Sequence, residues 1–68
     1  MNKARVEEPV WRFPFIGMGV GESFFIPTNS TEFLTYKVRT AAKEFGIKVV
    51  IRTRVEEDIL GIRVWRMD

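Results

Sequence analysis

Apolar and polar side chains alternate along two stretches near the C-terminus, residues 47–54 and residues 60–67. Such alternation is typical of a strand that has one wet face. Pairing the two stretches as an antiparallel hairpin gathers the aliphatic side chains on one face and leaves basic and aromatic side chains on the other. The residues predicted on this second face are Lys48, Arg52, Arg54, Arg63 and Trp65.

The segment between these stretches consists of Glu56, Glu57 and Asp58, which are too polar to be buried and therefore predict the turn of the hairpin. The segment contains neither Asn-Gly nor Asp-Gly, the pairs that favour a two-residue turn, so we expect a longer connection. Gly61 fits that expectation, either as a bulge or as the end of a longer loop.

A helix is predicted over residues 30–45, where apolar side chains repeat at helical spacing. Asn29 is the expected N-cap, which places Glu32 at the third helical position in a variant of the capping box. Gly46 is the expected C-terminal stop. The apolar stripe predicted to face the sheet is Leu34, Val38, Ala41, Ala42 and Phe45.

A further strand is predicted over residues 23–26, a short apolar run that Pro27 ends. Glycines precede it at alternate positions in the string IGMGVG, which invites comparison with a phosphate-binding loop. Such a loop, however, leads directly into a helix, whereas a strand follows here. We therefore interpret the glycines as turn residues.

The N-terminal residues 1–12 are predicted to be a flexible or extended arm, and residues 13–68 to be a single domain. At their junction lies the aromatic run VWRFPF, in which Pro14 favours extended backbone. In one interpretation Phe13 and Phe15 close one end of the core. In the alternative, the run forms an exposed docking patch for a partner or a second subunit, made of Trp11, Arg12 and Phe13.

Together these elements predict an α+β fold, with one helix packed on a small, mainly antiparallel three-stranded sheet and an extended N-terminal arm. A chain of 68 residues allows one small domain, and because so short a chain buries little surface, a homodimer is left open. The predicted core is Phe15, Phe24 or Phe25, Ile26, Leu34, Val38, Ala41, Phe45, Ile47, Val49, Ile51, Ile62 and Val64.

The amino-acid composition mainly excludes certain classes of protein and of functional site. Hydrophobic residues make up 46% of the chain, enough for a core, but no run has the length of a membrane span or the pattern of a signal peptide. We therefore expect a cytoplasmic protein. The chain has no cysteine and no histidine, and its clustered acids lie in a turn expected to be exposed. We accordingly expect no metal site, no cofactor and no enzyme activity.

The net charge is only +2, but residues 36–68 carry eight Lys/Arg against five Asp/Glu, whereas residues 1–35 carry three against four. The positive excess therefore lies on the predicted helix and hairpin. Nucleic-acid binding through the basic and aromatic sheet face is the first functional hypothesis. The alternatives are a protein-interaction module, because Trp and Arg dominate interface hot spots, and an ordinary solvated sheet face. The candidate binding residues are Lys48, Arg52, Arg54, Arg63, Trp65 and Arg66.

Several segments together resemble a group of small proteins encoded by tailed bacteriophages. They are FPF at 13–15, Met18, VGESFFIP at 20–27, Ala-Ala near the helix end, GIKVVIRTR at 46–54 and GIRVWR at 61–66. The resemblance implies a phage origin and action in the cytoplasm of a bacterial host. Together with the binding hypotheses drawn from the residues, it leads us to expect a small accessory protein that binds nucleic acid or, in the alternative, a host or phage protein. It implies no particular chemistry and carries over no catalytic residues.

Overall fold

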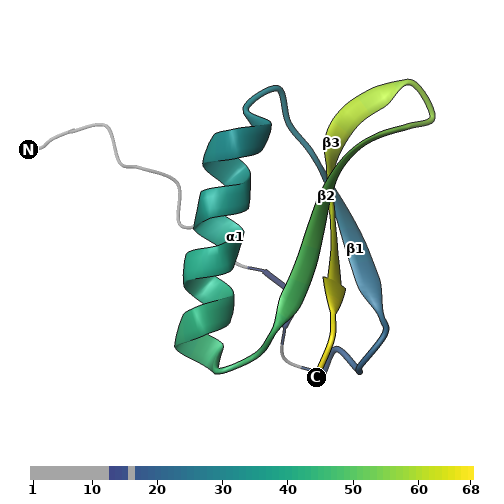
Figure 1. Ribbon diagram of the computed structural model, residues 1–68. Coiled ribbons are helices and arrows are strands. Elements are labelled where there is room, and N and C mark those ends of the chain that lie inside the picture. The colour runs from purple at the N-terminus through teal and green to yellow at the C-terminus, as the bar shows by residue number, and fades with distance from the viewer. Residues whose placement is uncertain (1–12, 16) are drawn as a thin grey trace, which may run out of the picture.

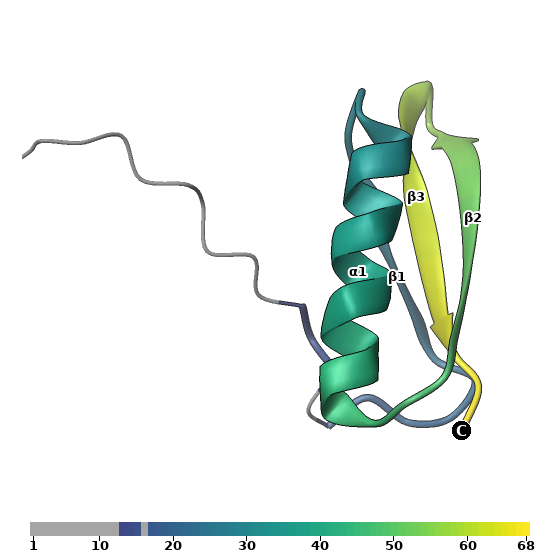
Figure 2. The ribbon, with the colours of Figure 1, turned by 60° about the vertical axis from the view of Figure 1, so that its left-hand side comes forward.

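One helix lies against a three-stranded antiparallel sheet in the computed structural model, which describes residues 13–15 and 17–68. The elements follow one another as β1 (Ser23–Pro27), α1 (Thr31–Phe45), β2 (Val49–Glu56) and β3 (Ile59–Arg66). The helix covers one face of the sheet along its length (Figures 1 and 2). The predicted α+β fold is confirmed, and the predicted arm over residues 1–12 lies outside the described residues.

The last strand, β3, is the central one, because the strand order is β1-β3-β2. Its register fixes which side chains share a face. Val64 lies opposite Phe24 and Ile51, whereas the next residue, Trp65, lies opposite Ser23 and Val50. Since Val64 is fully buried and Trp65 is half-buried, the alternation predicted for the hairpin is confirmed.

The turn between β2 and β3 is tighter than predicted. The ladder continues to the pair Glu56 and Ile59, which leaves only Glu57 and Asp58 to connect the strands. Both have positive φ, 52° and 65° respectively, as the central residues of a type I′ turn do. The expectation of a longer connection was wrong, because the twist of the paired strands selects this turn even without its preferred residues.

The interpretation of Gly61 as a bulge or loop residue was also wrong. It lies within a regular ladder, opposite Pro27 on one side and Arg54 on the other. A Cβ atom built here would collide with the backbone carbonyl of Ile26 and would lie 2.6 Å from Cζ of Phe25. Glycine is therefore required at this position by close packing between β1 and β3.

The two ends of α1 differ in how well they were predicted. The N-cap is Ser30 and not Asn29, and its side chain makes no capping hydrogen bond. Instead, the Ser30 backbone N–H donates to Oγ1 of Thr28 over 2.9 Å, so a local turn precedes the helix. At the other end, Gly46 adopts the left-handed conformation (φ 72°) and donates to carbonyls of the last turn, as predicted.

The core lies between α1 and the sheet and agrees with most of the prediction. Phe24, and not Phe25, packs against it, and Phe45 is 52% exposed although its ring lies 5.5 Å from that of Phe15. Met18 was not predicted but is buried. The buried core residues are Phe15, Met18, Leu34, Val38, Ala42, Ile51, Ile62 and Val64.

Phe13 belongs with this core. It is half-buried, and its ring centroid lies 6.4 Å from that of Phe24 and 5.9 Å from that of Phe15. Phe13 and Phe15 therefore close one end of the core, as the first interpretation of the aromatic run predicted. Trp11 and Arg12, the other members of the alternative docking patch, lie outside the described residues. Within the described part of the chain, no helix is long and apolar enough to cross a membrane.

Candidate nucleic-acid interface

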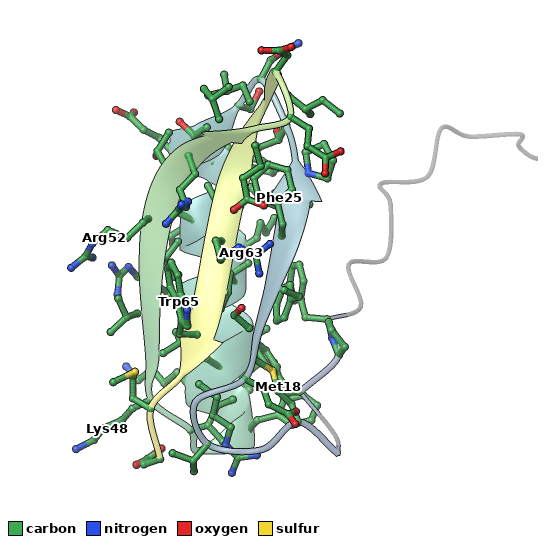
Figure 3. The ribbon with its side chains drawn as sticks, turned by 90° about the vertical axis from the view of Figure 1, so that its right-hand side faces the viewer. Met18, Phe25, Lys48, Arg52, Arg63 and Trp65 are labelled. Atoms are coloured by element: carbon green, nitrogen blue, oxygen red, sulfur yellow. The ribbon has the colours of Figure 1, made fainter. Side chains whose placement is uncertain are left out.

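The sheet face turned away from α1, here called the outer face, gathers most of the candidate binding residues. Figure 3 views this face, with Trp65 and Arg63 on the central strand and the helix behind the sheet. The arrangement follows from the register, because residues at every second position of each strand point to the same side. The outer-face residues include Ser23, Phe25, Val50, Arg52, Arg54, Glu56, Arg63 and Trp65.

Arg63 is held in place by three hydrogen bonds. Its Nε and Nη2 donate to the two carboxylate oxygens of Glu56, each over 2.7 Å, and its Nη1 donates to Oγ of Ser23, also over 2.7 Å. The guanidinium also lies over the ring of Phe25, 5.8 Å from its centroid. Arg63 therefore links the three strands, and its charge is already paired with a carboxylate.

The ion pair shifts the titration of both partners. The hydrogen bond from Arg63, assisted by the positive charges of Arg63 and Arg54, lowers the pKa of Glu56 below its ordinary value. The reciprocal hydrogen bond raises the pKa of Arg63. Glu56 is consequently ionised at neutral pH and supplies one fixed negative charge to the outer face.

Arg54 shares that negative charge but remains more accessible. Its Nε lies 3.3 Å from a Glu56 carboxylate oxygen, and its side chain is 51% exposed, compared with 26% for Arg63. The Arg54 guanidinium also lies 6.0 Å from the ring centroid of Trp65. Arg54 and the half-buried Trp65 thus place a cation next to an aromatic ring in the middle of the outer face.

Arg52 and Lys48 are the most available cations. The exposed Arg52 donates from Nη1 to the carbonyl of the adjacent Ile51 over 3.1 Å, and Lys48 is exposed just before β2 begins. Both side chains extend away from the sheet on the β2 side (Figure 3). Within residues 17–68, neither side chain forms an ion pair, so both charges are available to an anionic ligand.

Arg66 does not belong to the outer face. Its Nη1 donates to the carbonyl of Met18 over 2.7 Å, and its Nε donates to the carbonyl of Asp68. Its backbone completes the attachment, because its carbonyl accepts from Gly21 and its N–H donates to Glu22. Arg66 therefore fastens the glycine-containing segment before β1 to the end of β3. Its inclusion among the candidate binding residues is not supported by its position.

The three outer-face residues that contact Arg63 were not anticipated: Phe25, Ser23 and Glu56. The alternation that selected Arg52 and Arg54 also reaches Glu56 two positions later, so the sequence contained a signal for it. Glu56 was instead predicted to lie in the turn, because a charged residue next to Glu57 and Asp58 favours an exposed position. The positions of Ser23 and Phe25 beside Arg63 depend on the pairing of β1 with β3, which no local pattern indicates.

Comparison of the chain with protein-family models, with curated proteins and with solved structures finds no match. Within residues 13–15 and 17–68, no group of three or more acidic, histidine or cysteine side chains could hold a metal ion.

Proposed function

We propose that this protein binds nucleic acid through its outer face, as a small accessory protein without catalytic activity. One observation carries the proposal: the outer face presents Arg52, Arg54 and Arg63 together with Trp65, and Glu56 is the one acid among the strand residues of this face. Lys48 adds a fourth cation just before β2. Asp68, whose carboxylate accepts the backbone N–H of Lys48, adds a second acid beside this surface, so the four cations leave an excess of two positive charges. Such an excess attracts phosphates, and the release of their counterions favours binding. The cations are Lys48, Arg52, Arg54 and Arg63.

The cations divide into two kinds. Arg52 and Lys48 have no acidic partner within residues 17–68 and are proposed to neutralise phosphates directly. Arg63 keeps its bonds to Glu56 and positions the surface. Arg54 can exchange a shared carboxylate for a phosphate, which uncovers Trp65 for a base to stack on.

The resemblance to small tailed-phage proteins supports an accessory role in the cytoplasm of an infected bacterium as part of this proposal. The absence of histidine and cysteine supports binding without catalysis.

The test is fluorescence anisotropy with labelled oligothymidylate and with labelled duplex DNA, at several salt concentrations. The native protein is expected to bind more weakly as salt increases. Arg52→Ala removes an exposed side chain whose bond is to its own strand, so the fold is expected to persist. One lost phosphate contact lowers the single-strand salt slope by about 0.7, which is about a fivefold loss of affinity at 0.1 M salt.

Lys37→Ala is the matched control. Lys37 carries the same charge but lies on α1, 5.4 Å from the ring centroid of Phe33 and away from the outer face. We expect this variant to retain the native affinity within about twofold. If the native protein shows no salt-sensitive binding, or if Lys37→Ala weakens binding as much as Arg52→Ala, the outer face is not the binding surface.

A second candidate function, docking of a protein partner, is favoured by a different observation. The closed end of the hairpin bends away from α1 (Figure 1). It exposes Val55 (65%), Ile59 (49%) and Leu60 (37%). Because β2 is an edge strand, an extended segment of a partner or of a second copy could pair with it there. Homodimer formation is therefore a further outcome to measure.

A pull-down from bacterial lysate with and without nuclease separates the two candidates. Capture of one protein in stoichiometric amount that survives nuclease treatment, and is lost in Val55→Asp, supports protein docking. Capture that depends on nucleic acid supports the first candidate. Light scattering of the purified protein measures whether a second copy occupies the same edge.

A further inference from the structure

A second group of cations lies beside the outer face, in a shallow groove between α1 and the start of β2. The groove has a volume of about 380 Å³ and includes three exposed cationic residues, Arg39, Lys43 and Lys48. Its apolar surface comes from buried Ala42 and half-buried Ile47 and Val49. None of these six lining residues is acidic, so the groove combines an apolar floor with a positively charged rim.

Two cations of the rim lie close together on the same helix. Arg39 and Lys43 are four residues apart on α1, a spacing at which like charges repel and weaken a helix. An anion bound between them would remove this repulsion. Lys43 also lies in the last helical turn, where a basic side chain could bond to free carbonyls. The backbone N–H groups of Gly46 and Ile47 already donate to the carbonyls of Ala42 and Lys43, so the Lys43 side chain is not needed for those bonds.

Lys48 connects the groove to the outer face. Its backbone is fixed at both polar groups, because its N–H donates to Oδ1 of Asp68 and its carbonyl accepts from Met67, each over 2.8 Å. Its side chain lines the groove and also extends past the β2 edge, on the same side of the sheet as Arg52 (Figure 3). A ligand lying across the outer face therefore meets this side chain before it reaches the groove.

We infer that a single strand of nucleic acid bound on the outer face continues around the β2 edge into this groove. Its phosphates contact Arg39 and Lys43, and one base lies on the apolar floor. The inference rests on the proposed function. It also restricts the class of nucleic acid to single strands, because a flexible single strand can bend around a sheet edge, whereas a short duplex is too stiff to do so.

The negative charge of Asp68 repels a nucleic-acid strand that passes from the outer face into the groove. The Asp68 carboxylate lies beside Lys48, where it accepts the backbone N–H described above. Its charge lowers the attraction of the groove for phosphate. Asp68→Asn keeps an oxygen acceptor for this hydrogen bond and removes the charge, so it is expected to strengthen binding of a strand that reaches the groove.

The experiment compares two lengths of labelled oligothymidylate, roughly 6 and roughly 15 nucleotides, a span that covers known single-strand sites. The short strand is expected to occupy only the outer face. The double variant Arg39→Ala/Lys43→Ala removes two phosphate contacts, so affinity for the long strand should fall about 25-fold at 0.1 M salt while affinity for the short strand is unchanged. Arg39→Lys/Lys43→Arg preserves both charges and should preserve binding. Circular dichroism confirms that each variant folds.

The outcomes distinguish this inference from the proposed function. If Arg52→Ala weakens both strands while the Arg39→Ala/Lys43→Ala variant weakens neither, the groove is not used and the outer face remains the site. Equal weakening of both lengths by the double variant also overturns the inference, because the groove then does not extend the site. If the native protein binds neither strand, both proposals are wrong.

Discussion

Replacing Gly61 by alanine tests the account of how β1 and β3 pack. Gly61 is buried in the central strand, where β1 approaches so closely that no side chain fits. A Cβ atom would lie 2.6 Å from Cζ of Phe25 and 2.9 Å from the carbonyl carbon of Ile26. Ordinary carbon contacts are about 3.5–4.0 Å, so β1 and β3 must separate locally by roughly 1 Å.

The expected cost of Gly61→Ala is large for a chain of this size. Inserting an atom into a close-packed site costs about 1–3 kcal/mol, and the upper end applies because the obstruction includes the backbone of Ile26 as well as a movable side chain. A domain of 68 residues is stable by roughly 3–10 kcal/mol in total. A loss of about 3 kcal/mol lowers Tm by roughly 12–24 °C.

Urea unfolding followed by circular dichroism measures this loss. Gly19→Ala is the control, because its Cβ atom would make ordinary contacts, the nearest at 3.5 Å from Cδ of Glu22. We expect it to stay within about 0.5 kcal/mol of the native free energy of unfolding. Adding Phe25→Ala to Gly61→Ala should restore stability only in part, since the Ile26 carbonyl remains. If Gly61→Ala alone costs less than about 1 kcal/mol, the close approach of the strands is wrong.

The remaining predictions concern the turn, the ion pair and the core. Glu57→Asn with Asp58→Gly should raise the free energy of unfolding by roughly 1–2 kcal/mol in urea titrations, because both residues have positive φ; an unchanged value would contradict the turn assignment. Ionised Glu56 stabilises the fold above its unfolded pKa, and this contribution is lost as pH falls below about 4.5 through the lowered folded pKa. Urea midpoints of Glu56→Gln should therefore depend less on pH in this acidic range, and an unaltered pH dependence would exclude a stabilising pair with Arg63. Met18→Ala should cost about 2–5 kcal/mol because the side chain is 93% buried in the core; a surface-like loss below about 0.5 kcal/mol would contradict that placement.

The helix and the hairpin strands could be predicted because each has a local period. Apolar residues repeat along α1 until Gly46, where the left-handed conformation ends it. The alternation of β2 and β3 placed Val64 inside and Trp65 outside, and the register agrees. In contrast, the N-cap was wrong by one residue, because the Thr28 side chain accepts the Ser30 N–H and shifts the helix start.

The candidate site was predictable only in part. Alternation indicated that Arg52, Arg54, Arg63 and Trp65 share a face, and the structure brings these four together. It did not indicate that Glu56 occupies two of the donors of Arg63. The available charge therefore lies nearer the β2 edge than the sequence pattern alone implied.

The sequence by itself determined which segments are helical or extended and which side chains each strand presents to either side, because these properties depend on residues a few positions apart. Only the tertiary structure decided that β3 is central, that Arg63 reaches Ser23 across 40 positions of the chain, and that Lys48 joins the outer face to a groove beside α1. Those features depend on the order in which strands pair and on contacts between distant segments. Local periodicity carries no information about either, since the same alternating strand can pair at either edge of a sheet.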